Sequence, residues 1–191
     1  MKNKFIKFIL SFILTFSIMS FTANPEKKIV KTQNSTIAWK AYKVTGFHEG
    51  PVQLKEGFFT FEDDKLIGGE FIIDMNTIDA TDVKGLIKKK LVNHLKSDDF
   101  FNVKDHPTSK LVITNVEASE SGTYKVTADV TITGTTHPST FDMVINGNKA
   151  SATLKIDRTK YGLKYRSGSF FDDLGNKLIY DEFDVVVNLE F

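Results

Sequence analysis

The sequence predicts an all-β protein of about eight antiparallel strands with one amphipathic helix beside them. From residue 35 onward, apolar and polar residues alternate with a period of two, which is typical of strands with one buried and one solvated face. Helical spacing occurs only once, over residues 82–96. The segments between the alternating runs are rich in Gly, Asn, Asp and Ser, residues that favour turns.

Eight alternating runs carry this prediction, and the clearest of them is Tyr124–Ile132, in which every second residue is apolar. Asn146-Gly147-Asn148 separates two such runs and is a strong hairpin signal. We also expect Gly134–Pro138 to form a turn, with His48 and His137 in loops. The eight predicted strands are centred on Ile37–Ala41, Phe59–Phe61, Phe71–Met75, Leu111–Ile113, Tyr124–Ile132, Phe141–Asn146, Ala150–Asp157 and Phe183–Phe191.

The predicted helix places Val83, Ile87, Leu91 and Leu95 on one face, with lysines on the other. Asp79 or Thr81 is expected to cap its first turn.

The composition describes one ordinary globular domain. The chain has 191 residues, of which 41% are hydrophobic and 26% charged, and a domain of this size buries a real core. It contains no cysteine, which excludes disulfides, thiol catalysis and cysteine-ligated metals. Without the three N-terminal lysines, 22 basic residues face 24 acidic ones. This balance argues against binding to nucleic acid, which requires clustered cations.

The N-terminus is typical of a secretory signal. Three lysines precede an apolar run from Phe8 to Phe21, and small or polar residues follow. The run of 14 residues is shorter than the ~20 that span a bilayer, so we expect no permanent membrane anchor. We therefore expect a signal peptide at residues 1–23, a flexible leader at 24–34 and a single domain at 35–191, in a periplasmic or secreted protein.

Strands with one apolar face bury those faces together in either a sandwich or a closed barrel. Periodicity does not distinguish a sandwich from a barrel. An eight-stranded barrel is just wide enough to be filled by side chains or to hold one ligand. The dry faces here mix Phe and Trp with small residues such as Ala41, Ala128, Ala150 and Ala152. Both an open lumen and a filled core fit this mixture.

The sequence contains no catalytic motif, and we predict no catalytic residue, cofactor or metal. His94 and His106 flank Asp98 and Asp99, so a metal-assisted hydrolase is an alternative, although metal sites usually have closer spacing. The favoured interpretation places His94 on the polar edge of the helix and His106 in a turn before Pro107.

Segment 157–171 combines both arginines of the chain with several aromatic residues. Arginine binds phosphate through a planar fork, so Arg158, Tyr161 and Arg166 are candidates for a ligand head group at a barrel mouth. A solvated connection, with Arg158 paired to a carboxylate, is the simpler interpretation.

Four stretches together resemble the YceI family of bacterial lipocalin-like polyisoprenoid-binding proteins. They are Leu95–Val103 followed by Pro107-Thr108, Val126–Gly134 followed by Pro138, Asp157–Leu163, and Tyr180–Val185. The resemblance covers residues 35–191. It implies an extended eight-stranded antiparallel lipocalin-like barrel with a helix beside it, whose apolar lumen takes a long isoprenoid or another long-chain lipid.

The resulting functional hypothesis is sequestration or transport of such a lipid by a binding protein. The alternative is a filled barrel that acts as a stress or interaction protein without lipid, and a homodimer is compatible with both. We expect the lumen to be lined by Trp39, Phe59, Phe61, Phe71, Ile73, Phe101, Leu111, Ile113, Val126, Ala128, Val130, Phe141, Met143, Ala152, Leu154, Phe183 and Val185.

Overall fold

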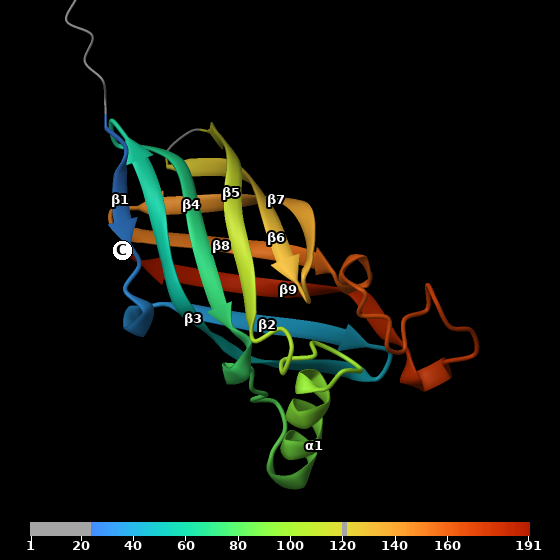
Figure 1. Ribbon diagram of the computed structural model, residues 1–191. Helices are drawn as coiled ribbons and strands as arrows, with labels where there is room; N and C mark the ends of the chain where they lie inside the picture. Colours follow the sequence, from blue (N-terminus) through green and yellow to red (C-terminus); the bar gives the residue numbers. More distant parts are fainter. Residues whose placement is uncertain (1–23, 120–121) are drawn as a thin grey trace, which may run out of the picture.

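The computed structural model describes residues 24–119 and 122–191, and Figure 1 shows a strongly curved antiparallel sheet with one helix at its lower end. The predicted signal peptide at residues 1–23 lies outside the described residues. The strands are β1 (Glu26–Ile29), β2 (Thr36–Lys43), β3 (Gly46–Glu62), β4 (Lys65–Asp74), β5 (Thr108–Ala118), β6 (Thr123–Ile132), β7 (Thr135–Asn146), β8 (Lys149–Asp157) and β9 (Ile179–Glu190).

The sheet closes into a barrel of eight strands. Its order runs β3-β2-β9-β8-β7-β6-β5-β4, and β4 pairs back with β3. Every pairing is antiparallel. The predicted all-β barrel with a helix is confirmed, and closure decides between barrel and sandwich. All eight predicted strands are present, and β1 is an additional ninth.

Strand β3 closes the barrel because it pairs with β2 on one side and with β4 on the other. Its first half, Gly46–Val52, pairs with β2, and residues 58–61 pair with β1. Its other side pairs with β4 from Gln53 to Glu62. Alternation did not predict this length, since Gly50 and Pro51 interrupt the pattern. Gly50 is required there because a Cβ would overlap the carbonyl oxygen of Asp79.

Two expectations about loops are wrong. His48 lies in β3 and His137 in β7, so neither is a loop residue. The turn expected over residues 134–138 is shorter, because Thr133 and Gly134 alone connect β6 to β7. Their φ angles of 49° and 75° are those of the tight hairpin turns that match strand twist.

Residues 24–34, expected to be a flexible leader, are largely ordered. Residues 26–29 form β1, and a 3-10 helix, η1, follows at Thr32–Asn34. The Val30 side chain is buried, and its backbone N–H donates to the carbonyl of Gly57 at 2.9 Å. Burial of one apolar side chain and ladder hydrogen bonds to β3 offset the entropy of ordering this segment.

The helix, α1 (Gly85–Lys96), begins later than predicted and packs only at its C-terminal part. Neither expected cap is used, because Lys84 stands at the N-cap position without a side-chain hydrogen bond. Leu95 is buried, but Ile87, expected on the buried face, is 65% exposed, and Leu86 is 76% exposed. The helix projects below the barrel, so its first turn has no sheet to pack against (Figure 1).

Candidate ligand-binding cavity

The barrel encloses an apolar cavity with a volume of about 170 Å³. All eight barrel strands contribute to it, together with Met75, Ile78, Leu95, Phe100 and Phe101 from the segments beside the barrel. The polar exceptions are Ser109, Lys110, Arg158 and Tyr180. The strand residues that line it are Ile37, Trp39, Ala41, Val52, Leu54, Phe59, Phe71, Ile73, Leu111, Ile113, Val130, Ile132, Phe141, Met143, Ala152, Leu154, Ile156, Ile179, Phe183, Val185, Val187 and Leu189.

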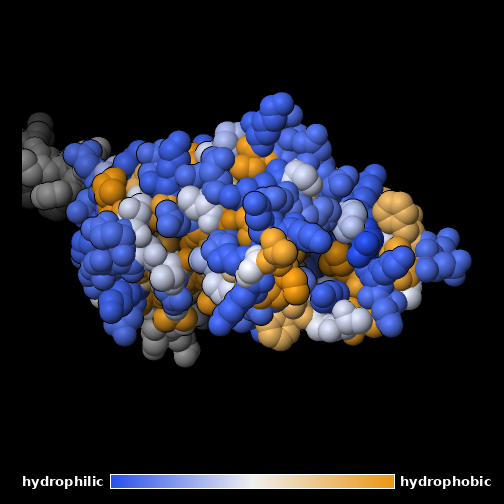
Figure 2. Space-filling model, turned by 90° about the horizontal axis from the view of Figure 1, so that it is seen from below, coloured by the Kyte–Doolittle hydropathy of each residue, from blue (hydrophilic) through white to orange (hydrophobic). Residues whose placement is uncertain are grey.

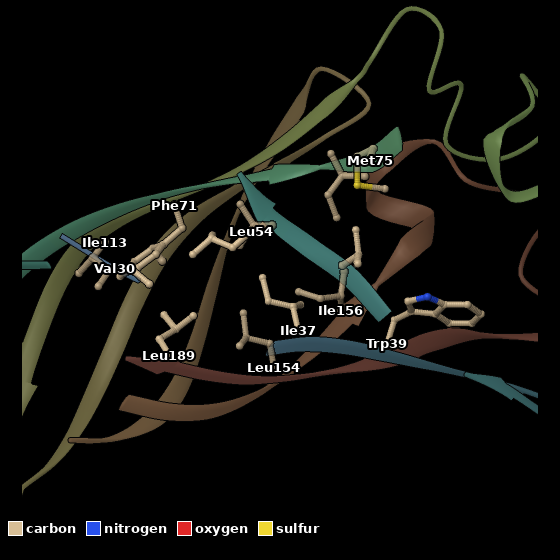
Figure 3. Close-up of a cluster of buried hydrophobic side chains, with 14 of the residues drawn as sticks. Val30, Ile37, Trp39, Leu54, Phe71, Met75, Ile113, Leu154, Ile156 and Leu189 are labelled. Carbon is tan, nitrogen blue, oxygen red and sulfur yellow. The ribbon is translucent and has the colours of Figure 1, made fainter. Parts of the chain in front are cut away.

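Alternation along the strands creates this lining, since every second side chain points inward. Figure 3 shows Ile37, Leu54, Leu154 and Ile156 between the strands, with Trp39 toward one side of the view. These residues are all buried. The lumen is therefore a hydrophobic compartment that runs through the middle of the fold.

Aromatic rings close the lumen at the end where the chain terminates. The Phe59 ring contacts those of Phe71 and Phe191 edge-on, at centroid distances of 4.9 and 5.0 Å. The ring centroids of Phe61 and Phe191 are 5.7 Å apart. Edge-to-face pairs of this kind stabilise one another beyond their burial. The lumen therefore ends in a wall of aromatic rings at this end.

The other end of the lumen lies next to α1. Leu95, Phe100 and Phe101 line the cavity there, and the two phenylalanine rings are 4.9 Å apart. Tyr180 also lines the cavity and is 51% exposed. Tyr180 therefore contributes to the lining of the lumen and also contacts solvent.

Arg158 lies at this end, but its guanidinium is bound largely by the chain itself. Its side chain is 2% exposed, although it contributes to the cavity lining. Nε donates to the Tyr180 carbonyl at 3.1 Å, and Nη1 donates to the Leu163 carbonyl. Nη2 donates to the Ile179 carbonyl at 2.9 Å and lies 3.5 Å from Asp181 Oδ1. Of five N–H donors, one at most is left for a ligand.

Burial lowers the pKa of Arg158, whereas the nearby carboxylates of Asp181 and Asp157 oppose this shift. The fork joins the end of β8 to the beginning of β9 and so fixes the shape of the mouth. The simpler interpretation from the sequence, a solvated connection with Arg158 paired to a carboxylate, holds only for the contact with Asp181, because the side chain is buried and donates mainly to backbone carbonyls.

The other two predicted mouth residues do not line the cavity. Tyr161 is buried, with its ring 5.4 Å from His137, and burial raises its pKa. Arg166 is exposed and lies over the Tyr165 ring at 5.0 Å. Contact of all three with a head group remains a prediction.

Most residues predicted for the lumen do line the cavity, and Phe61, Val126 and Ala128 do not. Val126 and Ala128 are fully buried in the core, and Phe61 belongs to the aromatic wall. Sequence reasoning missed Ile78, Leu95 and Phe100, which lie outside the strands and carry no alternation, and it also missed Met75, which ends the predicted strand Phe71–Met75 but lies just past β4. It also missed inward strand positions that the alternation could have identified: Ile37, Ala41, Ile132, Ile156, Val187 and Leu189.

The histidines considered for a metal site lie in different surroundings. The His94 ring lies 4.3 Å from that of Tyr165, and its buried Nε2 has no hydrogen-bond partner among the described residues. His106 lies beside Gly134 in the β6–β7 turn. Within residues 24–119 and 122–191, no three His, Asp or Glu side chains gather in a way that could hold a metal ion. Nor does any helix in that part of the chain have the length and apolar character needed to cross a bilayer.

Comparison of sequences identifies relatives across nearly the whole described chain. The family of YceI-like domains matches residues 29–191. A UPF0312 protein of Pseudomonas putida (strain W619) is 32% identical over 151 residues, covering 73% of this chain and 77% of that protein. A UPF0312 protein of Staphylococcus aureus (strain USA300) is 36% identical over 84 residues, covering 38% of this chain and 46% of that protein.

Solved structures share the fold at low sequence identity. BcnA of Burkholderia cenocepacia superimposes with a TM-score of 0.64 at 20% identity, covering 84% of this chain and 98% of that one. A polyisoprenoid-binding domain from Saccharophagus degradans, implicated in plant cell wall breakdown, gives a TM-score of 0.56 at 11% identity, covering 85% and 97%. These likenesses show a common barrel.

Proposed function

The chain belongs to the family of YceI-like domains, and from this premise we propose that its barrel encloses the apolar chain of an isoprenoid or a similar lipid. The observation that carries the proposal is the apolar cavity, to which all eight barrel strands contribute. A structural neighbour is itself a polyisoprenoid-binding domain, which supports the same ligand class. The proposed role is sequestration or transport in the periplasm or outside the cell, where a lipid needs shielding from water.

The free energy for binding comes from the removal of apolar surface from water. Each CH₂ buried contributes ~0.8 kcal/mol, so a chain of several carbons binds without any chemical step. The cavity of about 170 Å³ is close in size to engineered cavities of roughly 150 Å³ that hold one benzene ring. A longer tail therefore requires side chains at the α1 end, such as Phe100 and Phe101, to move apart.

The test is native mass spectrometry of residues 24–191 purified from a bacterial periplasm, followed by organic extraction. We expect a stoichiometric isoprenoid or other lipid in the extract. An empty protein that also takes up no added prenyl alcohol would overturn the proposal.

A matched pair of variants makes this test specific to the lumen. Ala152→Phe fills the cavity from β8, whereas Ser151→Phe adds the same ring to the outer face at the adjacent position. Only the first should abolish the bound lipid, and equal loss in both would indicate a general effect on folding.

The filled barrel is the second candidate function, and the small cavity favours it. Phe59 is fully buried, and the rings around it occupy one end of the lumen. In that case the barrel acts through its outer surface as an interaction or stress protein. The parent protein and both variants then carry no lipid, so their native masses differ only by the substituted residue.

A further inference from the structure

Large apolar side chains are exposed at the end of the barrel that carries α1. Leu86 and Ile87 on the first turn of the helix are 76% and 65% exposed, although most apolar residues elsewhere are at least partly buried. Four more lie on neighbouring loops and strand ends: Val44, Phe47, Phe170 and Phe171. Exposed apolar groups of this size mark contact with a partner or a membrane when they adjoin one another.

Three contacts join the elements that carry these residues. His48 Nδ1 lies 2.7 Å from Asp82 Oδ2, which ties the beginning of β3 to the segment before α1. The backbone N–H of Val44 donates to the Leu178 carbonyl at 3.2 Å, which ties the β2–β3 turn to the loop before β9. The His94 and Tyr165 rings, 4.3 Å apart, join α1 to that same loop.

Viewed from the α1 end, the molecule shows orange apolar groups at the centre and the right, set among blue hydrophilic ones (Figure 2). The six exposed apolar residues on α1 and the neighbouring loops and strand ends are called the apolar rim: Val44, Phe47, Leu86, Ile87, Phe170 and Phe171.

The helix next to the rim is strongly cationic. Segment 84–96 contains five lysines and no carboxylate. Lys88 pairs with Asp79 at 2.6 Å, whereas Lys84, Lys89 and Lys90 are exposed and form no ion pair within the described part of the chain. Asp172 and Asp173 directly follow Phe170 and Phe171 in the loop before β9, so the positive charge of this end lies on α1.

We propose that the apolar rim and the lysines of α1 dock this end of the barrel onto an anionic lipid bilayer. Apolar side chains flanked by lysines on one helix are the features of interfacial membrane binding. Each basic residue near an anionic surface strengthens binding roughly fivefold, and the rim residues enter the boundary between head groups and acyl chains.

Tyr180, which lines the cavity and is 51% exposed, belongs to β9 just after the loop that carries Phe170 and Phe171 of the rim. Docking there allows an apolar guest to pass between bilayer and lumen without crossing water. This exchange rests on the proposed lipid-binding function, whereas docking itself does not depend on any guest.

The experiment is co-sedimentation of residues 24–191 with two kinds of vesicle, one of phosphatidylcholine alone and one of equimolar phosphatidylcholine and phosphatidylglycerol. We expect binding to the anionic vesicles that falls with added salt. The double variant Leu86→Ser with Ile87→Ser should weaken binding to the anionic vesicles about tenfold. The double variant Lys89→Glu with Lys90→Glu reverses two charges, so it should weaken binding by more than the roughly fivefold per lysine that neutralisation alone would cause.

Matched controls lie at the other end of the barrel. Ile29 on β1 is 65% exposed, the same fraction as Ile87, so Ile29→Ser removes an equally exposed side chain. Lys125 and Lys149 are exposed lysines on β6 and β8, so Lys125→Glu with Lys149→Glu reproduces the change in net charge. Both control variants should bind vesicles as the parent protein does.

Absence of binding to anionic vesicles, or equal loss in the rim and control variants, would overturn the proposal. So would a dimer that Leu86→Ser with Ile87→Ser dissociates, because the rim would then contact a second copy. Failure of lipid binding is distinguishable from failure of docking, since lipid uptake is measured on the same variants without vesicles.

Discussion

The indole Nε1 of Trp39 donates a hydrogen bond to the backbone carbonyl of Asp79, with an N···O distance of 3.1 Å. Trp39 is an inward residue of β2 that lines the lumen, and Asp79 lies in the segment that leads to α1. The Asp79 carboxylate in turn binds Lys88 on α1, and this bond lowers the pKa of Asp79. Two polar contacts thus connect the wall of the cavity to the helix at its mouth.

Trp39 should report on occupancy of the lumen. It is the single tryptophan of the chain and lines the cavity, so a guest chain removes water and adds dispersion contacts around its ring. We expect a saturable shift in its fluorescence when a short prenyl alcohol is added, and saturable quenching by a brominated alkyl analogue. The Ala152→Phe variant should show neither effect, and an unchanged response in that variant would place the guest elsewhere.

Removal of the Arg158 fork should destabilise the barrel mouth strongly. Arg158→Met leaves the carbonyls of Leu163, Ile179 and Tyr180 without their donor, and we expect a loss of ~3–5 kcal/mol in the free energy of unfolding. Arg158→Lys restores the charge without the planar fork and should recover only part of this. Urea unfolding measures both.

The control for the fork is Arg166→Lys, since Arg166 is exposed and should tolerate the change within ~0.5 kcal/mol. If Arg158→Met were as stable as the parent protein but failed to bind lipid, the guanidinium would act on the ligand and not on the fold.

The strands were predictable because each strand must bury one apolar face, and this requirement produces the alternation of apolar and polar residues. Tyr124–Ile132 alternates without interruption and corresponds to β6, Thr123–Ile132, almost to the residue. Barrel closure was not predictable from periodicity, since it depends on β3 pairing with both β2 and β4 across Gly50 and Pro51, which interrupt the pattern.

The residues of the candidate site were predictable only so far as alternation along the strands identifies inward-facing positions. Inward strand positions such as Val130 and Leu154 line the cavity as expected, whereas Ala128 alternates in the same way but lies in solid core. Alternation assigns a side chain to the inner face and does not indicate where inner side chains leave space. Ile87 shows a related limit, because helical spacing identifies an apolar stripe but not the surface that covers it.

Two alanines on inner faces should respond differently to enlargement. Ala128 is fully buried outside the cavity lining, so Ala128→Leu should cost ~1–3 kcal/mol of stability through overpacking. Ala152 lines the cavity, so Ala152→Leu should instead weaken lipid binding with a smaller effect on stability. Thermal unfolding and ligand titration on the two proteins measure the contrast. Equal destabilisation would mean that the lumen is filled.

The stability of the barrel should fall in acid partly through Asp184. A hydrogen bond from Lys155 at 2.9 Å and another from Tyr42 at 2.8 Å hold the pKa of Asp184 below its ordinary value, although burial opposes them. A depressed carboxyl pKa stabilises the fold above the unfolded value of ~3.9, and this contribution disappears as the pH falls through the folded pKa.

Asp184→Asn should therefore cost ~1 kcal/mol at neutral pH, a small value because Lys155 is exposed, and almost nothing near pH ~2. Urea unfolding across this pH range measures the difference between the two proteins. A constant difference would show that packing, and not the charge of Asp184, is responsible.

The aromatic wall should set the maximum length of the guest. Phe191 lies 5.0 Å from Phe59, the ring that lines the closed end of the cavity, and it is the last residue of the sequence given. Phe191→Ala extends the lumen toward solvent, so longer prenyl alcohols should gain affinity relative to geraniol. Because Phe191 is only partly buried, we expect a cost of about 2 kcal/mol in stability.

The control for chain length is Phe58→Ala on the same strand as Phe59. Phe58 alternates to the other face, where Lys27 lies over its ring at 4.0 Å, so its removal should leave the preference for chain length unchanged. Isothermal titration with prenyl alcohols of increasing length, at equal free concentration, measures the preference in both variants. An unchanged length profile in Phe191→Ala would mean that the guest never reaches the wall, and that the mouth beside α1 holds its whole apolar part.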